Sequence, residues 1–405
     1  MAEPALTVES IRTSFPILKR EVNGCPLVYC DSAATSLTPL EVMQAEAHFY
    51  CTIGANVHRG SHALALEASD AYEGARATIA RFVGAATRQV VFTANATAAL
   101  NLVAAGLPLD GDDEVLASVN DHHAALLPWL KRGRLRLFDA PLQQTLDVDA
   151  FRRALGPRTR AVVLTHASNV TGVVQAVREL CQVAREHGVL TIVDASQSAP
   201  HLPIDVAAMG CDFLALSGHK LLGPTGIGVL YGRDAALASL APRDIGGGTV
   251  TRASSSAFTW SALPARLEPG TPNIAGAIGL AAATRYLERV GFAWMEQHHA
   301  ELAALLQTKL GGLPGVRMLS SSEPGALPMA SLSLSGLPTA VDVVAATLSD
   351  RYGVMVRSGL HCAHPLFERL ELPDGALRAS FYLYNTAAEV SYFCDSLAEI
   401  LSLFG

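Results

Sequence analysis

The sequence predicts an α/β fold in which a mostly parallel central sheet is flanked by helices. Short apolar runs rich in β-branched residues alternate with longer helical patterns, and this alternation is typical of βαβ units. At 405 residues the chain exceeds the usual size of one compact core, so we expect a second, smaller α+β domain. Hydrophobic residues make up 50% and charged residues 17% of the chain, which indicates a large buried interior.

The predicted elements follow this alternation. Asn23-Gly24, between two short extended segments, predicts a tight hairpin at 22–29. Helical patterns are expected over 98–107 and, as the last helix, over 387–403. Glycine and serine dominate 246–256, which predicts a flexible loop. The expected strands are 90–92, 114–117, 135–138, 161–164, 190–193, 213–216 and 227–231.

The alternation of short strands and helices ends near residue 275, and this change in pattern predicts a domain boundary. From there on, long helical patterns are broken by only a few strands. We therefore expect a large domain at 28–274 and a small C-terminal domain at 275–405 that carries Cys362. The N-terminal segment 1–27 is expected to pack on the small domain.

Charge, hydropathy and cysteine content exclude several classes of protein. Lys+Arg 30 against Asp+Glu 37 gives a formal net charge of −7, which disfavours nucleic acid or anionic lipid as the main partner. No apolar run has the length of a membrane span, and the N-terminus lacks the features of a signal peptide, so we expect a cytoplasmic protein. Seven cysteines without a Cys-x-x-Cys pair argue against a disulfide framework and a structural zinc site.

Ser217-Gly218-His219-Lys220 is the most informative motif, because it directly follows the apolar run 213–216. A lysine amine at a strand end can form a Schiff base with an aldehyde cofactor, while Ser217 and His219 can hydrogen-bond the phosphate of that molecule. Taken alone, the motif also fits a solvated loop lysine. Asp194 likewise ends an apolar run, and an aspartate there can hold a pyridine nitrogen protonated.

These residues match the requirements of pyridoxal phosphate, which needs an amine, an anion for its ring nitrogen, a flat group against its ring and donors for its phosphate. His122 is the candidate for the flat group, although a capping or surface histidine is an equally good interpretation. Thr97 stands at the start of a predicted helix, where backbone N–H groups bind anions. Chemistry in parallel sheets gathers beyond the carboxyl ends of the strands, and the candidates that follow predicted strands are Asn169, Asp194, Gln197 and Lys220.

Cys362 stands in a second cluster, with Arg357 before it and His361 and His364 on either side. A cysteine in such surroundings can have a stabilised thiolate, which is the nucleophilic form. Histidine and cysteine also suggest a metal site, but adjacent His361 and Cys362 chelate one ion poorly and no second cluster completes the set. We therefore favour a nucleophile over a metal ligand or inert packing. Arg378, in a strand-like segment, can grip a carboxylate or make an ordinary ion pair.

Further motifs extend along nearly the whole chain: Asp31-Ser32-Ala33-Ala34-Thr35, Asn56-Val57-His58-Arg59-Gly60, Ser168-Asn169-Val170-Thr171-Gly172, Gly223-Pro224-Thr225-Gly226-Ile227-Gly228, Pro269-Gly270-Thr271-Pro272-Asn273 and Arg378-Ala379-Ser380. In this order, the motifs resemble those of the type II cysteine desulfurases, the SufS and CsdA group of class V, fold type I pyridoxal phosphate enzymes. The Arg-x-Gly-x-His-Cys-Ala form at 357–363 resembles type II rather than the NifS-like type I. Two stretches depart from the family pattern: 249–258, and Asn95-Ala96-Thr97-Ala98, where the family usually has Gly-Thr-Thr-Glu.

The resemblance implies a role for each candidate toward the cofactor. Lys220 would be the Schiff-base lysine, Asp194 the partner of the pyridine nitrogen and His122 the stacking group. Residues implied to lie beside the cofactor hydroxyl and the substrate are Gln197 and Asn169. Residues implied to hold the phosphate are Ala96, Thr97, Ser217 and His219, with Thr271 reaching in from a second subunit of a homodimer.

The resemblance also implies a reaction. Arg378 would bind the carboxylate of L-cysteine, with Arg357 and His361 beside the substrate. Cys362 would take the sulfur as a persulfide and leave L-alanine. The sulfur would then pass to a SufE/CsdE-like or SufU-like acceptor protein for iron–sulfur cluster assembly. Two alternatives remain: another class V enzyme, such as a selenocysteine lyase, aminotransferase or epimerase that need not use Cys362, and a non-enzymatic interaction protein that has kept the fold.

Overall fold

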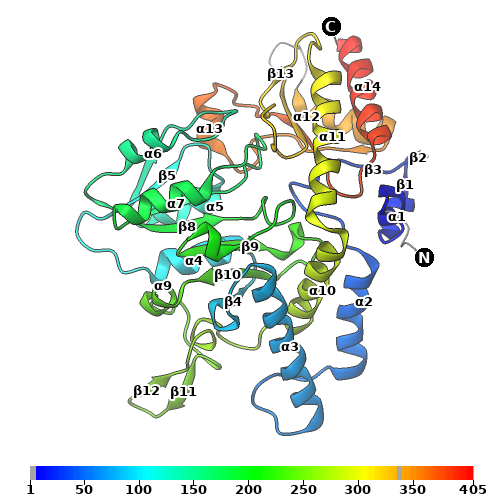
Figure 1. The fold of residues 1–405 in the computed structure, drawn as a ribbon. Coiled ribbons are helices and arrows are strands. Elements are labelled where there is room, and N and C mark those ends of the chain that lie inside the picture. The colour runs from blue at the N-terminus through cyan, green and yellow to red at the C-terminus, as the bar shows by residue number, and fades with distance from the viewer. Residues whose placement is uncertain (1–5, 335–339, 405) are drawn as a thin grey trace.

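The computed structural model describes residues 6–334 and 340–404, and its centre is a seven-stranded sheet in the order β4-β10-β9-β8-β7-β5-β6 (Figure 1). β10 runs antiparallel to β4 and β9, whereas the remaining neighbouring pairs are parallel. The mostly parallel α/β sheet and all of its predicted strands are therefore confirmed. The bounds are β4 (Val90–Thr93), β5 (Glu114–Ser118), β6 (Leu135–Phe138), β7 (Thr159–Thr165), β8 (Leu190–Asp194), β9 (Phe213–Ser217) and β10 (Gly228–Gly232).

Helices cover both faces of this sheet. Side chains alternate along a strand, so Leu214 and Leu216 enter one core while Phe213 and Ala215 enter the other. Burial on both faces explains why the strands read as continuous apolar runs. Helices of the first core are α3 (Ala63–Phe82), α6 (Val148–Ala154), α7 (Val177–Glu186), α8 (Val206–Met209) and α10 (Ile274–Val290). Helices of the second core are α4 (Ala96–Gly106), α5 (His123–Lys131) and α9 (Asp234–Ser239).

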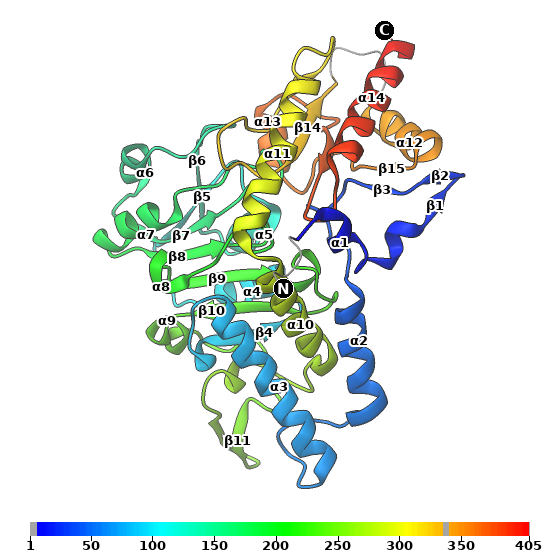
Figure 2. The same cartoon turned by 45° about the vertical axis from the view of Figure 1, so that its right-hand side comes forward.

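The C-terminal part contains its own antiparallel sheet, in the order β13-β14-β16, with helices packed against it (Figure 2). The expected last helix is confirmed as α14 (Ala387–Phe404). The other elements are β13 (Arg317–Met318), β14 (Met329–Ser333), β15 (Val354–Met355), β16 (Leu377–Ser380), α11 (Phe292–Leu310), α12 (Val341–Tyr352) and α13 (His364–Arg369). Across 6–334 and 340–404, the helices include none with both the length and the apolar character that crossing a bilayer requires.

We keep the division at 1–27, 28–274 and 275–405 as a proposal. Arg12 of α1 (Val8–Arg12) makes a 2.8 Å ion pair with Glu389 of α14, so the N-terminal segment contacts the C-terminal part. β3 (Val28–Tyr29), at the start of the proposed large domain, pairs in parallel with β15. α10 packs on α2 (Leu40–His48) and α3 and buries its apolar side chains in the core of the large sheet. The proposed boundary between 28–274 and 275–405 therefore coincides with the start of α10, whose apolar side chains belong to the core of the large sheet.

The two predicted turns have different outcomes. β1 (Glu21–Val22) and β2 (Cys25–Pro26) form the expected tight hairpin, with Asn23 and Gly24 at φ of 51° and 79°. The prediction of one flexible loop over 246–256 is wrong, because β11 (Val250–Ala253) pairs with β12 (Phe258–Trp260). The serine content that suggested flexibility closes the turn instead, since the Ser254 hydroxyl accepts the Ala257 N–H at 3.0 Å.

A buried histidine pair lies between α11 and the loop after β8. The rings of His201 and His299 are 4.9 Å apart, and the His201 ring is 4.6 Å from that of Tyr382. Among the described residues, His201 Nδ1 and His299 Nε2 have no hydrogen-bond partner. Burial lowers the pKa of His201 to about 3, and burial followed by the neighbouring histidines lowers the pKa of His299 well below its usual range.

We predict that this pair makes the fold sensitive to acid. Both folded-state pKa values lie below the unfolded value of about 6.5, so stability is lost as the pH falls below that value. Each neutral histidine should account for about 1.4 kcal/mol between about pH 7.5 and pH 5.5. His299→Leu should reduce the loss of unfolding free energy over that interval in urea titrations. An unchanged pH dependence in this variant, with the exposed His48→Gln as control, would contradict the prediction.

Candidate active site

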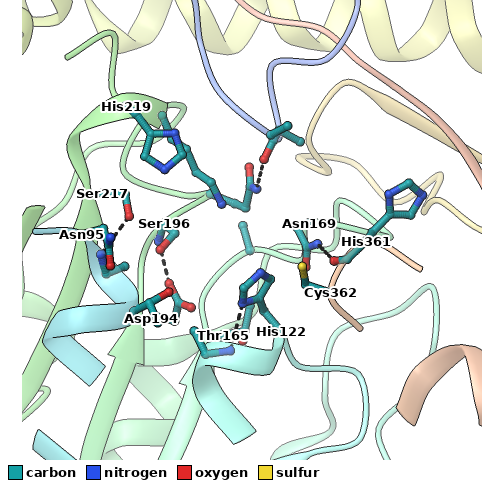
Figure 3. A pocket seen from close by; sticks show the side chains of 18 of the residues that line it. Asn95, His122, Thr165, Asn169, Asp194, Ser196, Ser217, His219, His361 and Cys362 are labelled. Atoms are coloured by element: carbon teal, nitrogen blue, oxygen red, sulfur yellow. Dashed lines mark hydrogen bonds between the residues drawn. The ribbon is translucent and has the colours of Figure 1, made fainter. Parts of the chain in front are cut away.

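A cavity of about 320 Å³ opens beyond the carboxyl ends of β7, β8 and β9 (Figure 3). This is the edge at which the sequence predicts the site, and most of the predicted residues meet there. Those that line the cavity are Ala96, Thr97, His122, Asn169, Asp194, Gln197, Ser217, His219, Lys220, Arg357, His361, Cys362 and Arg378. They come from both the large sheet and the C-terminal part, so the cavity lies between the two.

Lys220 ends the short 3-10 turn η4 (Gly218–Lys220), which directly follows β9. Gly218 permits this turn, because a Cβ there would lie 2.8 Å from Ile227 Cγ2 and 2.9 Å from the Ile227 carbonyl oxygen. Burial lowers the pKa of Lys220 to about 8, although the negative charge of Asp194 works in the opposite direction. A fraction of the amine is therefore neutral near physiological pH, as a nucleophilic lysine requires.

Asp194 is the last residue of β8 and is buried. Its Oδ1 accepts the N–H of Ser196 at 2.9 Å, which fixes the orientation of the carboxylate. Gln197, three residues beyond the strand, donates from Nε2 to the Ala33 carbonyl at 2.7 Å. The sharp turn after β8 thus presents an anion and an amide to the same cavity.

His122 combines the two interpretations that the sequence left open. It is the N-cap of α5, and its Nδ1 accepts the Ala124 N–H at 3.0 Å. Its ring also lines the cavity. Burial, followed by the positive charge of Lys220, lowers the pKa of His122 to about 4. The ring is therefore neutral, and because Nδ1 accepts, Nε2 carries the proton.

The N-terminus of α4 forms the part of the cavity suited to a phosphate. Asn95 caps the helix by accepting the Ala98 N–H at 2.8 Å, and Ser217 Oγ accepts the Ala96 N–H at 2.8 Å. Within the described part of the chain, the Thr97 amide and hydroxyl have no hydrogen-bond partner. Free donors at a helix N-terminus suit an anion, and the Asn95 cap leaves the Thr97 amide and hydroxyl available for one.

His219 forms the wall next to this helix end. Its Nδ1 lies 3.2 Å from the Thr35 hydroxyl, and its backbone carbonyl accepts from the same hydroxyl at 3.0 Å. Burial, followed by Lys220, lowers the pKa of His219 to about 4. The segment 31–36 therefore packs directly against the lysine-bearing turn, which the sequence alone did not indicate.

Arg378, in β16, is buried with its side chain 3% exposed. Its Nη1 donates to the Asn169 carbonyl at 2.9 Å, and its Nη2 lies 3.3 Å from Asp31 Oδ1. Among the described residues, its Nε has no partner. Arg357 is half-exposed and contacts the other oxygen of Asp31 at 2.9 Å. The ion pair that sequence reasoning gave as an alternative is present, and unfilled donor capacity remains for a carboxylate.

Asp31 is a residue of this site that sequence reasoning missed. It appeared in the motif at 31–35, but no role was assigned to it. It follows β3, which pairs with β15, and β15 leads to Arg357. The pairing of β3 with β15 brings Asp31 to Arg357, and a bridge between Asp31 and Ser380 of β16 brings it to Arg378. These long-range pairings place one carboxylate beside two arginines.

Cys362 is exposed at the mouth of the cavity, beside Asn169 and His122 (Figure 3). His361 and Cys362 both have left-handed backbones, with φ of 46° and 56°. Such conformations cost roughly 1–2 kcal/mol per non-glycine residue. Asn169 Nδ2 donates to the His361 carbonyl at 2.8 Å, and the His361 ring contacts the Ala376 carbonyl through Nε2 at 3.0 Å. Burial, followed by Arg378, lowers the pKa of His361 to about 3.

Thr271 does not line this cavity. It borders two other cavities, one of about 770 Å³ with His58 and Arg59 and one of about 330 Å³ with Arg243 and Asn273. A single chain therefore does not bring Thr271 to the predicted phosphate site. Its placement is consistent with a role in another subunit, which remains a proposal.

Comparisons with known proteins agree with this geometry. The family model described as "Aminotransferase class-V" matches residues 28–393. The chain belongs to this family. A probable cysteine desulfurase of Halalkalibacterium halodurans is 41% identical over 99% of this chain and 99% of its own, and one of Synechocystis is 40% identical over 98% of this chain and 96% of its own.

Solved structures of this family share the fold over the full length. The apo cysteine desulfurase of Thermococcus onnurineus has a TM-score of 0.92 and 37% identity, with 100% of both chains covered. The cysteine desulfurase CsdA of Escherichia coli has a TM-score of 0.90 and 34% identity, with 99% of this chain and 100% of its own covered. The class V assignment and the resemblance to cysteine desulfurases are thus confirmed.

Proposed function

We propose that this protein is a pyridoxal phosphate-dependent cysteine desulfurase that converts L-cysteine to L-alanine and holds the sulfur as a persulfide on Cys362. The observation that carries the proposal is that an exposed cysteine and a half-buried lysine line one cavity, together with a buried arginine that has unfilled donor capacity. Full-length relatives named probable cysteine desulfurases support this assignment.

The residues present fit the cofactor. Lys220 supplies the amine, Asp194 the anion, His122 a neutral flat ring, and the start of α4 with Ser217 and His219 the phosphate donors. Bound there, pyridoxal phosphate would supply an electron-withdrawing ring that acidifies the α-carbon of the substrate and weakens its C–S bond.

The protein side chains then bind and orient the amino acid. Arg378 would pair with the substrate carboxylate, because its buried Nε lacks a partner among the described residues. Holding the carboxylate there would orient the substrate so that its thiol faces Cys362, which lines the same cavity. The partly neutral amine of Lys220 would take the proton from the α-carbon and return it.

Sulfur transfer needs no external oxidant or reductant. The Cys362 thiolate forms an S–S bond to the substrate sulfur while the C–S bond of the substrate breaks. The electron pair of that bond remains with the carbon, which takes up a proton. L-cysteine and the Cys362 thiol thus give L-alanine and a Cys362 persulfide, with all atoms balanced.

We propose that the enzyme works as a cytoplasmic homodimer in which Thr271 contributes to the phosphate site of the other subunit. The exposed position of Cys362 suits delivery of sulfur to a SufE/CsdE-like or SufU-like acceptor protein, for iron–sulfur cluster assembly. Neither nucleic acid nor membrane is expected as a partner, given the net charge of −7.

The test is product analysis of the cofactor-loaded protein with L-cysteine. We expect L-alanine and transferable sulfur in equal amounts. A keto acid product, racemisation of the amino acid, or turnover of L-selenocysteine without any turnover of L-cysteine would reject the proposal in favour of another class V activity.

We predict that Asp194→Asn retains the cofactor but slows turnover on the order of a hundredfold. The amide keeps the size of the side chain but loses the charge, and a charge-assisted contact in such a site contributes about 2 to 4 kcal/mol. Steady-state alanine formation and the visible absorbance of the bound cofactor measure the two effects separately. Near wild-type turnover would remove Asp194 from the proposed role.

A further inference from the structure

On the N-terminal side of Cys362, the loop is fixed by two hydrogen bonds of His361. Asn169 donates to the His361 carbonyl at 2.8 Å, and the His361 ring contacts the Ala376 carbonyl at 3.0 Å. Left-handed backbones at His361 and Cys362 persist only where the surroundings hold them in place. A second set of contacts is therefore needed to fix Cys362 itself.

His123 provides that second set. Its backbone N–H donates to the Cys362 carbonyl at 2.8 Å, and its ring Nε2 accepts the His364 N–H at 3.3 Å. The rings of His123 and His364 lie 4.4 Å apart. One residue thus binds the chain on both sides of Ala363. Because Nε2 accepts a hydrogen bond, the ring is neutral and its proton is on Nδ1.

The contacts of His123 link two parts of the site. His123 is the first residue of α5, and its neighbour His122 is the N-cap that lines the cavity. His123 itself does not line the cavity. The loop position of Cys362 is therefore set relative to the ring of His122. A displacement of about 1 Å between reacting groups can cost about a hundredfold in rate.

We propose that His123 is a positioning residue for sulfur transfer: its backbone donor and ring acceptor hold the Cys362 loop so that Cys362 Sγ faces the substrate sulfur. This inference rests on the proposed function. His123 acts through Cys362 and touches neither substrate nor cofactor.

Three substitutions separate the hydrogen bond from the ring contact. His123→Phe keeps the ring and the backbone donor but removes the acceptor, whereas His123→Gln restores a side-chain acceptor. His364→Ala is the matched control, because it removes a ring but keeps the backbone N–H. For His123→Phe we expect kcat for alanine formation to fall about 10- to 100-fold with KM for L-cysteine unchanged. His123→Gln should recover most of the loss, and His364→Ala should remain close to wild type.

A second measurement does not depend on turnover. In the cofactor-loaded protein without substrate, the rate at which iodoacetamide modifies Cys362 should change several-fold in His123→Phe but not in His123→Gln. Peptide mass spectrometry locates the modification, and unchanged visible absorbance shows that the cofactor site is intact. This comparison remains valid even if Cys362 proves not to carry sulfur, so failure of the proposed function can be distinguished from failure of this inference.

Equal kcat and equal modification rates in wild type, His123→Phe and His123→Gln would overturn the proposal. An equal loss of kcat in His364→Ala and His123→Phe would also overturn it, because the ring contact would then be responsible. If His123→Phe does not fold, His123→Leu replaces it in the same comparison with His123→Gln.

Discussion

Lys220→Ala is expected to abolish covalent attachment of the cofactor and to reduce alanine formation by several orders of magnitude. The chain has four lysines, and Lys220 is the one that lines the cavity. Its lowered pKa makes its amine the best nucleophile of this type in the site. Reduction of the loaded protein with borohydride, followed by peptide mapping, measures the attachment directly.

The control for this experiment is Lys131→Ala, which changes a lysine at the last residue of α5, at the opposite end of the helix from His122. That variant should retain the modified peptide and the activity. A cofactor-labelled peptide in Lys220→Ala would show that another amine performs this role.

The second large effect is expected for Cys362→Ser, which should bind L-cysteine but form no persulfide. In the proposed site the cofactor and carboxylate contacts would come from Lys220, Asp194 and Arg378, so we expect substrate binding to be retained. A hydroxyl is too weak a nucleophile toward sulfur to replace the thiolate. Spectral titration with L-cysteine measures binding, and alanine release measures turnover.

A matched control is Cys51→Ser, because Cys51 is also exposed but does not line the cavity. Full desulfurase activity in Cys362→Ser would refute the role of Cys362. Activity of this variant with L-selenocysteine is compatible with the proposal, since selenium can leave without attack by a thiolate.

The central sheet could be predicted because its strands are buried on both faces. Runs such as 213–216 are continuously apolar, and no helical period competes with them. The ends were harder to place, because β8 and β9 continue through the polar residues Asp194 and Ser217. Asp194 and Ser217 also line the candidate active site. A polar residue at the end of an apolar strand therefore makes the strand boundary hard to predict and at the same time indicates the site.

Contacts made by long-range pairing could not be predicted. Asp31 reaches Arg357 because β3 pairs with β15, and it reaches Arg378 because it also bridges Ser380 of β16. His123 reaches His364 only because the C-terminal part folds onto α5. Neither contact has a periodic or local sequence signal. In each case a recognisable motif stood at one end, and its partner was visible only in the folded chain.

The loop at 246–256 shows the opposite error, in which a local signal was overinterpreted. Glycine and serine suggested flexibility, but residues 250–253 pair with residues 258–260, and Ser254 closes the turn between them. Composition alone does not separate a mobile loop from a short exposed hairpin, because both tolerate small polar residues.

The central claim is that sulfur from L-cysteine resides on Cys362, and mass spectrometry of the protein after brief exposure to L-cysteine tests it most directly. The account predicts one added sulfur atom on the wild-type peptide that contains residue 362, and none on the corresponding peptide of Cys362→Ser. Added sulfur on a peptide containing Cys25, Cys51 or another cysteine instead, with residue 362 unmodified, would contradict it.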